Sequence, residues 1–282
     1  MAQSIRVLNS FVTFGNTNDY ITDTGCGITK SFCFPFVAGA DLAFQMQFLT
    51  GVAAENFDFE IVSVKDGVET EVQFTTIDVQ QVTALIVGVY FDFFNSNLGN
   101  EYNEGECFTL KITAIGSHGS GTYVFESDQC FQKTDECGTA VLRYWNEEDA
   151  FGFDYYVITA SQENNYNRIR LPLYFKNPVV RNNQKVYVRS DGSRKKLFAR
   201  LAMQYQCITD VMTEEVHQKL NVALQHDDVN FTIGNPAVKT FNCTFEDEYN
   251  NQFPNMMQPI NAWPADFLVY ETPFDQVNSN CQ

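Results

Sequence analysis

The sequence lacks any run of about eighteen apolar residues, which is the length that a helix needs to cross a bilayer. Its first residues, MAQSIRVLNSFVTFG, also lack the basic and then apolar pattern of a secretory signal peptide. We therefore expect a protein that has no membrane span and is made in the cytoplasm.

Sequence motifs for catalysis, cofactors and metals are missing as well. No glycine-rich phosphate loop and no Ser/His/Asp or Cys/His arrangement is visible. The eight cysteines form no C-x2-C pair or Cys/His cluster, so their spacing does not favour structural zinc. We expect no enzymatic activity, no cofactor and no metal site. In a reducing compartment the cysteines are expected to be free and buried rather than bridged.

Positive charge is scarce and unevenly distributed. The chain has 18 Lys and Arg against 35 Asp and Glu, a net charge of -17, which argues against a surface that tracks nucleic acid. Ten of the basic residues lie in 168–200 beside one acid, so this segment carries +9 and the remainder -26. We expect the basic segment to contact the acidic surface or the C-terminal segment of an adjacent copy, head to tail, and repetition of such a contact can close a ring. The candidate interface residues in this segment are Arg189, Arg194, Lys195, Lys196 and Arg200.

Aromatic residues and alternating patterns are abundant and predict a mainly β fold. The 26 Phe and 13 Tyr suit pleated, half-buried surfaces. In DLAFQMQF (41–48) every second residue is apolar, and Asp66-Gly67 is typical of a tight hairpin turn. The stretch 84–94, ALIVGVYFDFF, is apolar on both faces and predicts a central strand. Residues 1–130 are therefore expected to form a β-sandwich or jelly-roll-like domain.

A second β-rich domain is expected over 131–240, with the boundary between the domains inside the polar stretch 126–139. It contains a strand in 168–175 and a hairpin that turns at Asp191-Gly192. One helix is expected at about 213–226, capped by Thr213. Its apolar stripe consists of Val216, Leu220, Ala223 and Leu224.

The last 42 residues (241–282) contain no Lys or Arg, six acids and four prolines, yet many large apolar side chains. Proline at this spacing prevents a long helix, and disordered chains are poor in aromatics. We expect an extended, acidic and apolar C-terminal arm that lies along another surface, in the same or a neighbouring subunit. Its candidate interface residues are Trp263 and Phe267.

The stretch LRYWNEEDAFGFDYY (142–156) combines six aromatic residues with four carboxylates. Glycoside hydrolases need two carboxylates about 5–10 Å apart across the scissile bond, which Glu147, Glu148 or Asp154 would have to supply. Because neighbouring side chains in a strand point to opposite faces, we interpret the acids, Asp149 included, as a solvated turn or as partners of the basic segment. In the alternative of a carbohydrate- or receptor-binding protein, the sugar-stacking residues would be Tyr144, Trp145 and Phe151.

The order of these motifs resembles that in tail and neck structural proteins of Bacteroidetes phages, crAss-like phages among them. LRYWNEEDAFGFDY is followed by RIRLPLYF and then by VYVRSDGSRKKLFARLAMQYQCITDVMTEEVHQKLNVALQHDDVNF, so that the resemblance covers roughly residues 130–232. GECFTLKI and FESDQCF extend it more loosely upstream. The resemblance implies a virion protein, assembled in the host cytoplasm, that is present in several copies in a collar, hub or baseplate ring with other tail or neck proteins. It implies no catalytic residues.

Overall fold

The structure is a computed structural model that describes thirteen segments of the chain. These are residues 5–8, 11–12, 14–16, 32–49, 57–73, 75–83, 86–116, 121–135, 137–145, 166–177, 179–233, 239–245 and 262–271. Within them the protein is mainly β, as the sequence predicts, with two main sheets.

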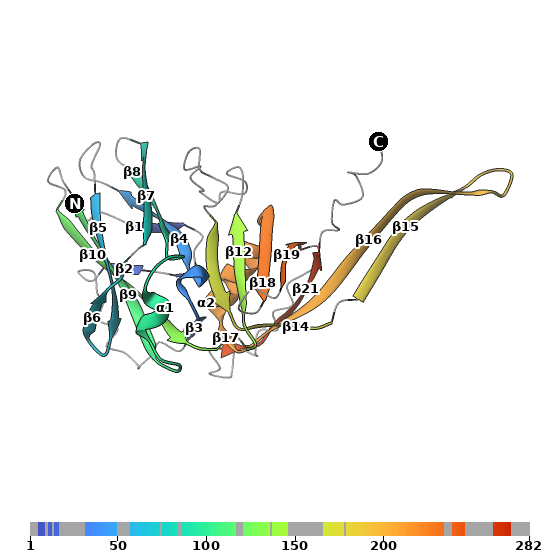
Figure 1. Ribbon diagram of the computed structural model, residues 1–282. Helices are drawn as coiled ribbons and strands as arrows, with labels where there is room; N and C mark the ends of the chain where they lie inside the picture. The colour runs from blue at the N-terminus through green and yellow to red at the C-terminus, as the bar shows by residue number, and fades with distance from the viewer. Residues whose placement is uncertain are drawn as a thin grey trace, which may run out of the picture.

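The larger sheet has twelve strands in the order β14-β16-β21-β19-β18-β12-β13-β4-β8-β7, with β1 beside β4 and β15 beside β16 (Figure 1). Its strands are β1 (Ile5–Leu8), β4 (Ala43–Leu49), β7 (Thr76–Thr83), β8 (Ile86–Asp92), β12 (Ala140–Trp145), β13 (Asn167–Leu171), β14 (Leu173–Phe175), β15 (Val179–Val188), β16 (Arg194–Thr209), β18 (Asp228–Ile233), β19 (Lys239–Thr244) and β21 (Asp266–Glu271).

The smaller sheet has seven strands, and most of its neighbours are antiparallel. Its strands are β2 (Phe14–Asn16), β3 (Cys33–Phe36), β5 (Phe57–Lys65), β6 (Val68–Glu71), β9 (Cys107–Gly116), β10 (Thr122–Ser127) and β11 (Cys130–Lys133). The remaining elements are a 3-10 helix η1 (Gly39–Asp41), the helices α1 (Leu98–Glu101) and α2 (Glu214–Leu224), and a two-stranded pair of β17 (Met212–Thr213) with β20 (Ala262–Trp263).

The two sheets pack face to face through aromatic side chains, which gives the sandwich-like arrangement. Phe14 of the smaller sheet lies 5.3 Å from Phe44 of the larger one, and Phe59 meets Phe91 edge-on at 5.4 Å, measured between ring centroids. Such ring pairs add to the gain from burying apolar area. One continuous cluster of buried residues runs from Phe11 to Val269.

The local elements agree with the sequence patterns. Asp66 and Gly67 both have positive φ (51° and 78°), as a tight hairpin turn requires, and Gly192 has φ 80°. The strand predicted over 84–94 is confirmed as β8, which lies inside the larger sheet between β4 and β7.

The predicted helix is confirmed as α2, and all four residues of its apolar stripe are buried. Thr213 occupies the N-cap position with an extended backbone, but its side chain caps no backbone N–H. The capping role predicted for Thr213 is therefore wrong, although the position is right.

The single strand expected over 168–175 is two strands, because Pro172 interrupts it. Proline has no N–H to donate to a ladder. On its two sides the chain joins different neighbours, since β13 pairs with β12 and β14 pairs with β16.

The described strands of the C-terminal arm pair with other strands of the same chain. β21 is paired with β16 on one side and with β19 on the other, and Phe267 and Val269 are buried there. We expected the arm to lie along a surface of the same or of a neighbouring subunit, and this segment lies in the same subunit.

The larger sheet runs across the predicted domain boundary at residue 130. Arg168 of β13 lies opposite Ala43 of β4, so strands from before and after the boundary share one sheet. Asp41 and Arg170 form a buried ion pair across the same boundary. The division into domains 1–130 and 131–240 stays a prediction.

Candidate interaction surface

A long hairpin of β15 and β16 projects from one end of the molecule (Figure 1). The strands pair antiparallel from Val179 opposite Gln204 to Val188 opposite Arg194, with a shift in register after Lys185. We call residues 179–204 the protruding hairpin. Within the described residues its strand β15 pairs with β16 alone, so the other edge of β15 presents backbone groups that the sheet does not use.

A tight turn closes the end of the hairpin. The backbone N–H of Arg189 donates to the carbonyl of Ser193 at 2.8 Å, and that of Gly192 donates back to Arg189 at 2.9 Å. Asp191 accepts a hydrogen bond from the backbone N–H of Ser193 at 2.8 Å. Hydrogen bonds from the side chain and backbone of Ser193 lower the pKa of the Asp191 carboxyl group. The carboxylate of Asp191, the sole acid of the hairpin, therefore accepts hydrogen bonds within the turn itself.

The other end of the hairpin is anchored in the body of the protein. The second half of β16 lies between β14 and β21, and Cys207 on it is fully buried. The Tyr205 hydroxyl donates to Glu271 at 2.8 Å, and Gln204 Nε2 donates to the Tyr270 hydroxyl at 3.0 Å. The projecting part of the hairpin is therefore a continuation of a strand that is held on both sides in the larger sheet.

The hairpin exposes apolar side chains on both faces. Val179 and Val180 are each 56% exposed, Tyr187 is 55% exposed and Val188 is 56% exposed, and neighbours along a strand point to opposite faces. A two-stranded ribbon is marginally stable alone, and exposed apolar patches mark interaction sites. These exposed residues were not predictable from the sequence, because VYV between polar residues is equally typical of a buried strand.

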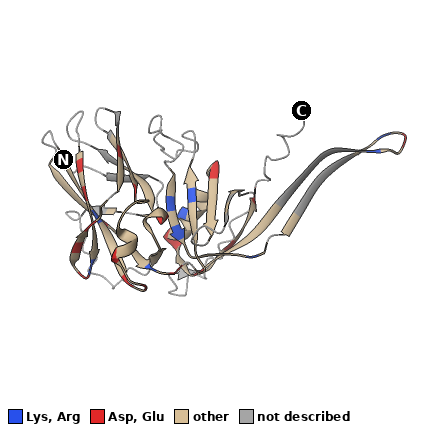
Figure 2. Cartoon of the chain, in the orientation of Figure 1, with Lys and Arg blue, Asp and Glu red and all other residues tan. Residues whose placement is uncertain are grey.

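The hairpin is also strongly basic. It holds seven Lys and Arg and one acid, a charge of +6, so the rest of the chain carries -23. Arg189 and Arg194 are exposed at the turn (Figure 2). The other candidates, Lys195, Lys196 and Arg200, lie on β16, and their side chains are outside the described residues.

Two arginines of the basic segment are not part of this surface. Arg170 makes a bidentate pair with Asp41, with both N–O distances 2.8 Å and both side chains 4% exposed. Arg168 pairs with Asp92. The basic segment therefore contains two arginines of β13 that pair with acids of η1 and β8, and a separate group of seven Lys and Arg that lies on the hairpin.

The candidates in the C-terminal arm are not on the surface of the hairpin. Phe267 is 2% exposed and lies 6.4 Å from Phe245, ring to ring, inside the chain's own core. Its assignment to a subunit interface is therefore wrong. Trp263 lies on β20 opposite Met212, and its side chain is outside the described residues.

Of the sugar-stacking candidates, Tyr144 is 1% exposed and packs against Phe11 and the buried His226. A ligand cannot reach its ring, so the predicted sugar-stacking role of Tyr144 is wrong. Trp145 is half-buried beside Tyr166. Phe151 and the acids Glu147, Glu148, Asp149 and Asp154 lie outside the described residues.

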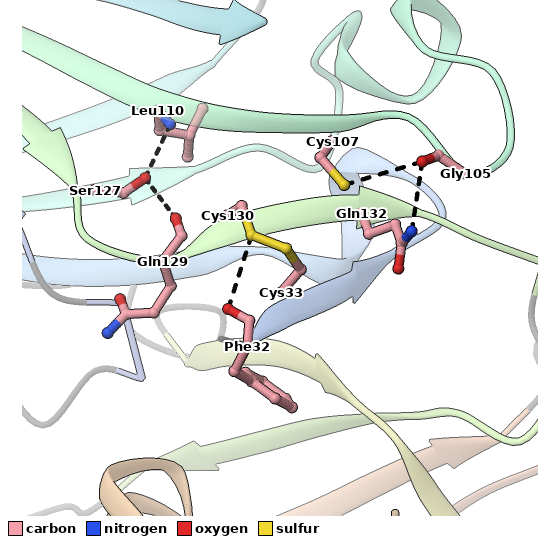
Figure 3. The surroundings of a disulfide bond; sticks show 9 residues. All are labelled: Phe32, Cys33, Gly105, Cys107, Leu110, Ser127, Gln129, Cys130 and Gln132. Atoms are coloured by element: carbon pink, nitrogen blue, oxygen red, sulfur yellow. Dashed lines mark hydrogen bonds between the residues drawn. A yellow bond between two sulfur atoms is a disulfide. The ribbon is translucent and has the colours of Figure 1, made fainter. Parts of the chain in front are cut away.

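The expectation that the cysteines are free and buried is only partly correct. Cys33 on β3 and Cys130 on β11 lie opposite each other in a parallel pair, 4.6 Å apart between Cα atoms, and form a disulfide (Figure 3). Cys107 and Cys137 are free and exposed. Cys207 and Cys243 are free and buried as predicted, and burial raises the pKa of both thiols, to about 12 for Cys243. These two thiols are protonated and unreactive at neutral pH.

Over the described part of the chain, no group of three or more His, Cys, Asp or Glu residues could hold a metal ion. None of the described helices is long and apolar enough to cross a membrane. No protein-family model matches the chain, and no curated protein is significantly similar to it.

Proposed function

We propose that this chain is a non-enzymatic structural protein of a phage virion whose copies assemble head to tail into a ring in the tail, neck or baseplate. One observation carries the assembly part of the proposal. The hairpin is a basic two-stranded ribbon with apolar side chains exposed on both faces, and it stands away from an otherwise acidic chain.

Several physical arguments support a second copy as the partner. A contact between different surfaces of identical copies repeats itself, and it closes into a ring when the rotation permits. Opposite charges on the two surfaces favour this orientation over a symmetric contact between two basic hairpins. Nucleic acid is a poorer partner, because the remaining -23 repels phosphates near the surface.

The virion setting rests on the resemblance of residues 130–232 to tail and neck proteins. The described residues favour no second function, and the receptor-binding alternative keeps Trp145 as its one described and partly exposed ring. An enzyme is not proposed.

Mass spectrometry of purified phage particles tests the setting, because a ring protein is present in several copies per particle. Gel filtration with light scattering of the purified chain tests the assembly. A chain that is absent from particles and strictly monomeric at high concentration contradicts the proposal.

A further inference from the structure

A cleft of about 620 Å³ is lined by residues of β5, β6 and β7 and of the segment between β6 and β7. The strands β5 and β6 lie far from the hairpin along the molecule (Figure 1). The volume of the cleft lies in the range of binding pockets, roughly 300–1,000 Å³. The residues that line it are Phe59, Glu60, Ile61, Val62, Glu71, Val72, Gln73, Thr75 and Ile77.

The cleft is lined by both apolar and acidic residues. Among the lining residues, Ile61 and Val72 are buried, whereas Glu60 and Glu71 are exposed. This combination suits an incoming group that brings both apolar and positively charged side chains.

The shape of the cleft is held by hydrogen bonds in its wall. Val72 donates its backbone N–H to Ile61 at 2.9 Å. The Asn97 side chain accepts from the backbone of Gln73 at 2.9 Å and donates to the carbonyl of Glu71 at 3.2 Å. A preformed site loses less entropy when a partner binds.

Within the described residues, no Lys or Arg side chain pairs with the carboxylates of Glu60 and Glu71. Residues 57–116 contain ten acids and two bases. Both bases have other acidic partners, since Lys65 pairs with Glu106 and Lys111 pairs with Glu69. Within the described residues the carboxylates of Glu60 and Glu71 therefore remain available to a cation from outside.

The hairpin of the same chain does not reach this cleft. β5 and β6 lie at one end of the molecule and the turn of the hairpin at the opposite end (Figure 1). Asp and Glu occur over the end that holds β5 and β6, and basic residues reach the hairpin's turn (Figure 2). A basic tip and an acidic cleft at opposite ends can meet only between copies.

We infer that the acidic cleft between β5, β6 and β7 is the acceptor for the hairpin tip of the next copy. This inference rests on the proposed head-to-tail assembly and adds the acceptor site. In this contact Tyr187 lies against the apolar part of the cleft lining, while Arg189 and Arg194 face Glu60 and Glu71.

The chemistry of the two surfaces agrees with this assignment. Arg and Tyr are enriched among the residues that dominate interface energies, and the tip exposes both types. A guanidinium can bind a carboxylate through two parallel hydrogen bonds, which Glu60 and Glu71 can accept.

A photo-crosslinker tests the contact directly. Tyr187 is replaced by benzoylphenylalanine in the full-length chain, the assembled protein is irradiated, and crosslinked peptides are mapped. We expect crosslinks to residues 59–77 of another copy. Crosslinks to a different surface, or no crosslinks between copies, overturn the acceptor assignment.

Charge reversal gives a second test. Both R189E/R194E and E60K/E71K are expected to weaken assembly roughly tenfold or more, because like charges across an interface cost several kcal/mol. The four changes together restore opposite charges and are expected to restore assembly. E104K is the matched control, since Glu104 is exposed in the same part of the chain but does not line the cleft.

The outcomes separate the two proposals. If R189E/R194E prevents assembly and E60K/E71K behaves like E104K, the hairpin contacts another surface, so the acceptor is wrong and head-to-tail assembly stands. If neither pair of changes alters the mass of the assembly, or the unchanged chain is monomeric, both proposals fail.

Discussion

At the scale of single residues, the basic segment contains two kinds of arginine that charge alone cannot distinguish. Arg170 is buried against Asp41 and Thr139, whereas Arg189 is exposed at the hairpin turn. The sequence shows ten cations beside one acid but not their partners, because Asp41 is 129 positions from Arg170. Only the fold brings that carboxylate to the guanidinium.

The Asp41–Arg170 pair leads to a stability prediction. Asp41 also accepts hydrogen bonds from the backbone N–H groups of Val37 at 2.8 Å and Ala38 at 3.1 Å. Asp41→Ala leaves a buried, unpaired guanidinium, and we expect it to lower the free energy of unfolding by about 3–5 kcal/mol. Urea unfolding measures this, with Glu104→Ala as an exposed control. A loss as small as that of the control contradicts the assigned role.

His226 leads to a prediction about pH. Burial lowers its pKa to about 4, and Nδ1–H of the ring donates a hydrogen bond to the Val222 carbonyl at 2.9 Å. In the unfolded chain the pKa is about 6.5, so the unfolded state gains a proton first as the pH falls. The free energy of unfolding is therefore not reduced by this group above about pH 6.5. It decreases as the pH falls toward 4, by up to about 3 kcal/mol.

The measurement is urea unfolding at intervals between pH 7 and pH 4. His226→Gln is expected to show a smaller decrease over this window, because glutamine does not titrate. An equal decrease in the variant and the unchanged chain assigns the pH dependence to other groups.

At the scale of elements, alternating patterns and turn residues predicted individual strands well, and long-range pairing was not predictable. The Asp66-Gly67 and Asp191-Gly192 turns follow from local backbone preference. The insertion of β21 between β16 and β19 joins strands about 60 residues apart in sequence, as in the contact of Cys207 with Phe267. No local pattern specifies that pairing. The length of β16 was also missed, because its two halves have different surroundings.

The disulfide is a second long-range feature and is testable. Cys33 and Cys130 are 97 positions apart, and closing so long a loop in the unfolded chain stabilises the fold by about 3–5 kcal/mol in the chain-entropy account. We expect Cys33→Ala/Cys130→Ala to lose stability of this order. Cys107→Ser/Cys137→Ser serves as the control, because both residues are free and exposed. Alkylation of Cys33 and Cys130 in the unreduced, denatured protein would contradict the bond.

We predict that removing the outer part of the hairpin abolishes assembly without destabilising the folded chain. Its outer part pairs only with itself in the described structure, so replacing residues 183–200 by an Asn-Gly turn removes little that holds the body together. We expect the free energy of unfolding to change by less than about 1 kcal/mol, while assembly is lost. Thermal unfolding and light scattering of the same sample measure both. Assembly at normal affinity without the hairpin contradicts its role.

At the scale of the whole molecule, the chain has a basic projection at one end and an acidic, cleft-bearing body at the other. The opposed charge blocks were visible in the sequence, and their placement at opposite ends required the fold. Because the two surfaces of one chain lie at opposite ends (Figure 1), the proposed head-to-tail contact would form between copies. Because the proposed contact between copies is partly ionic, we expect it to weaken when added salt shortens the screening length from about 10 Å at 0.1 M.

The most direct test of this account is the mass and shape of particles that the purified full-length chain forms, by native mass spectrometry and negative-stain imaging. We predict closed rings whose masses are whole multiples of the 32.1 kDa chain, and their loss when residues 183–200 are replaced. Particles of a single chain's mass at every concentration, or rings that form equally well without the hairpin, would contradict it.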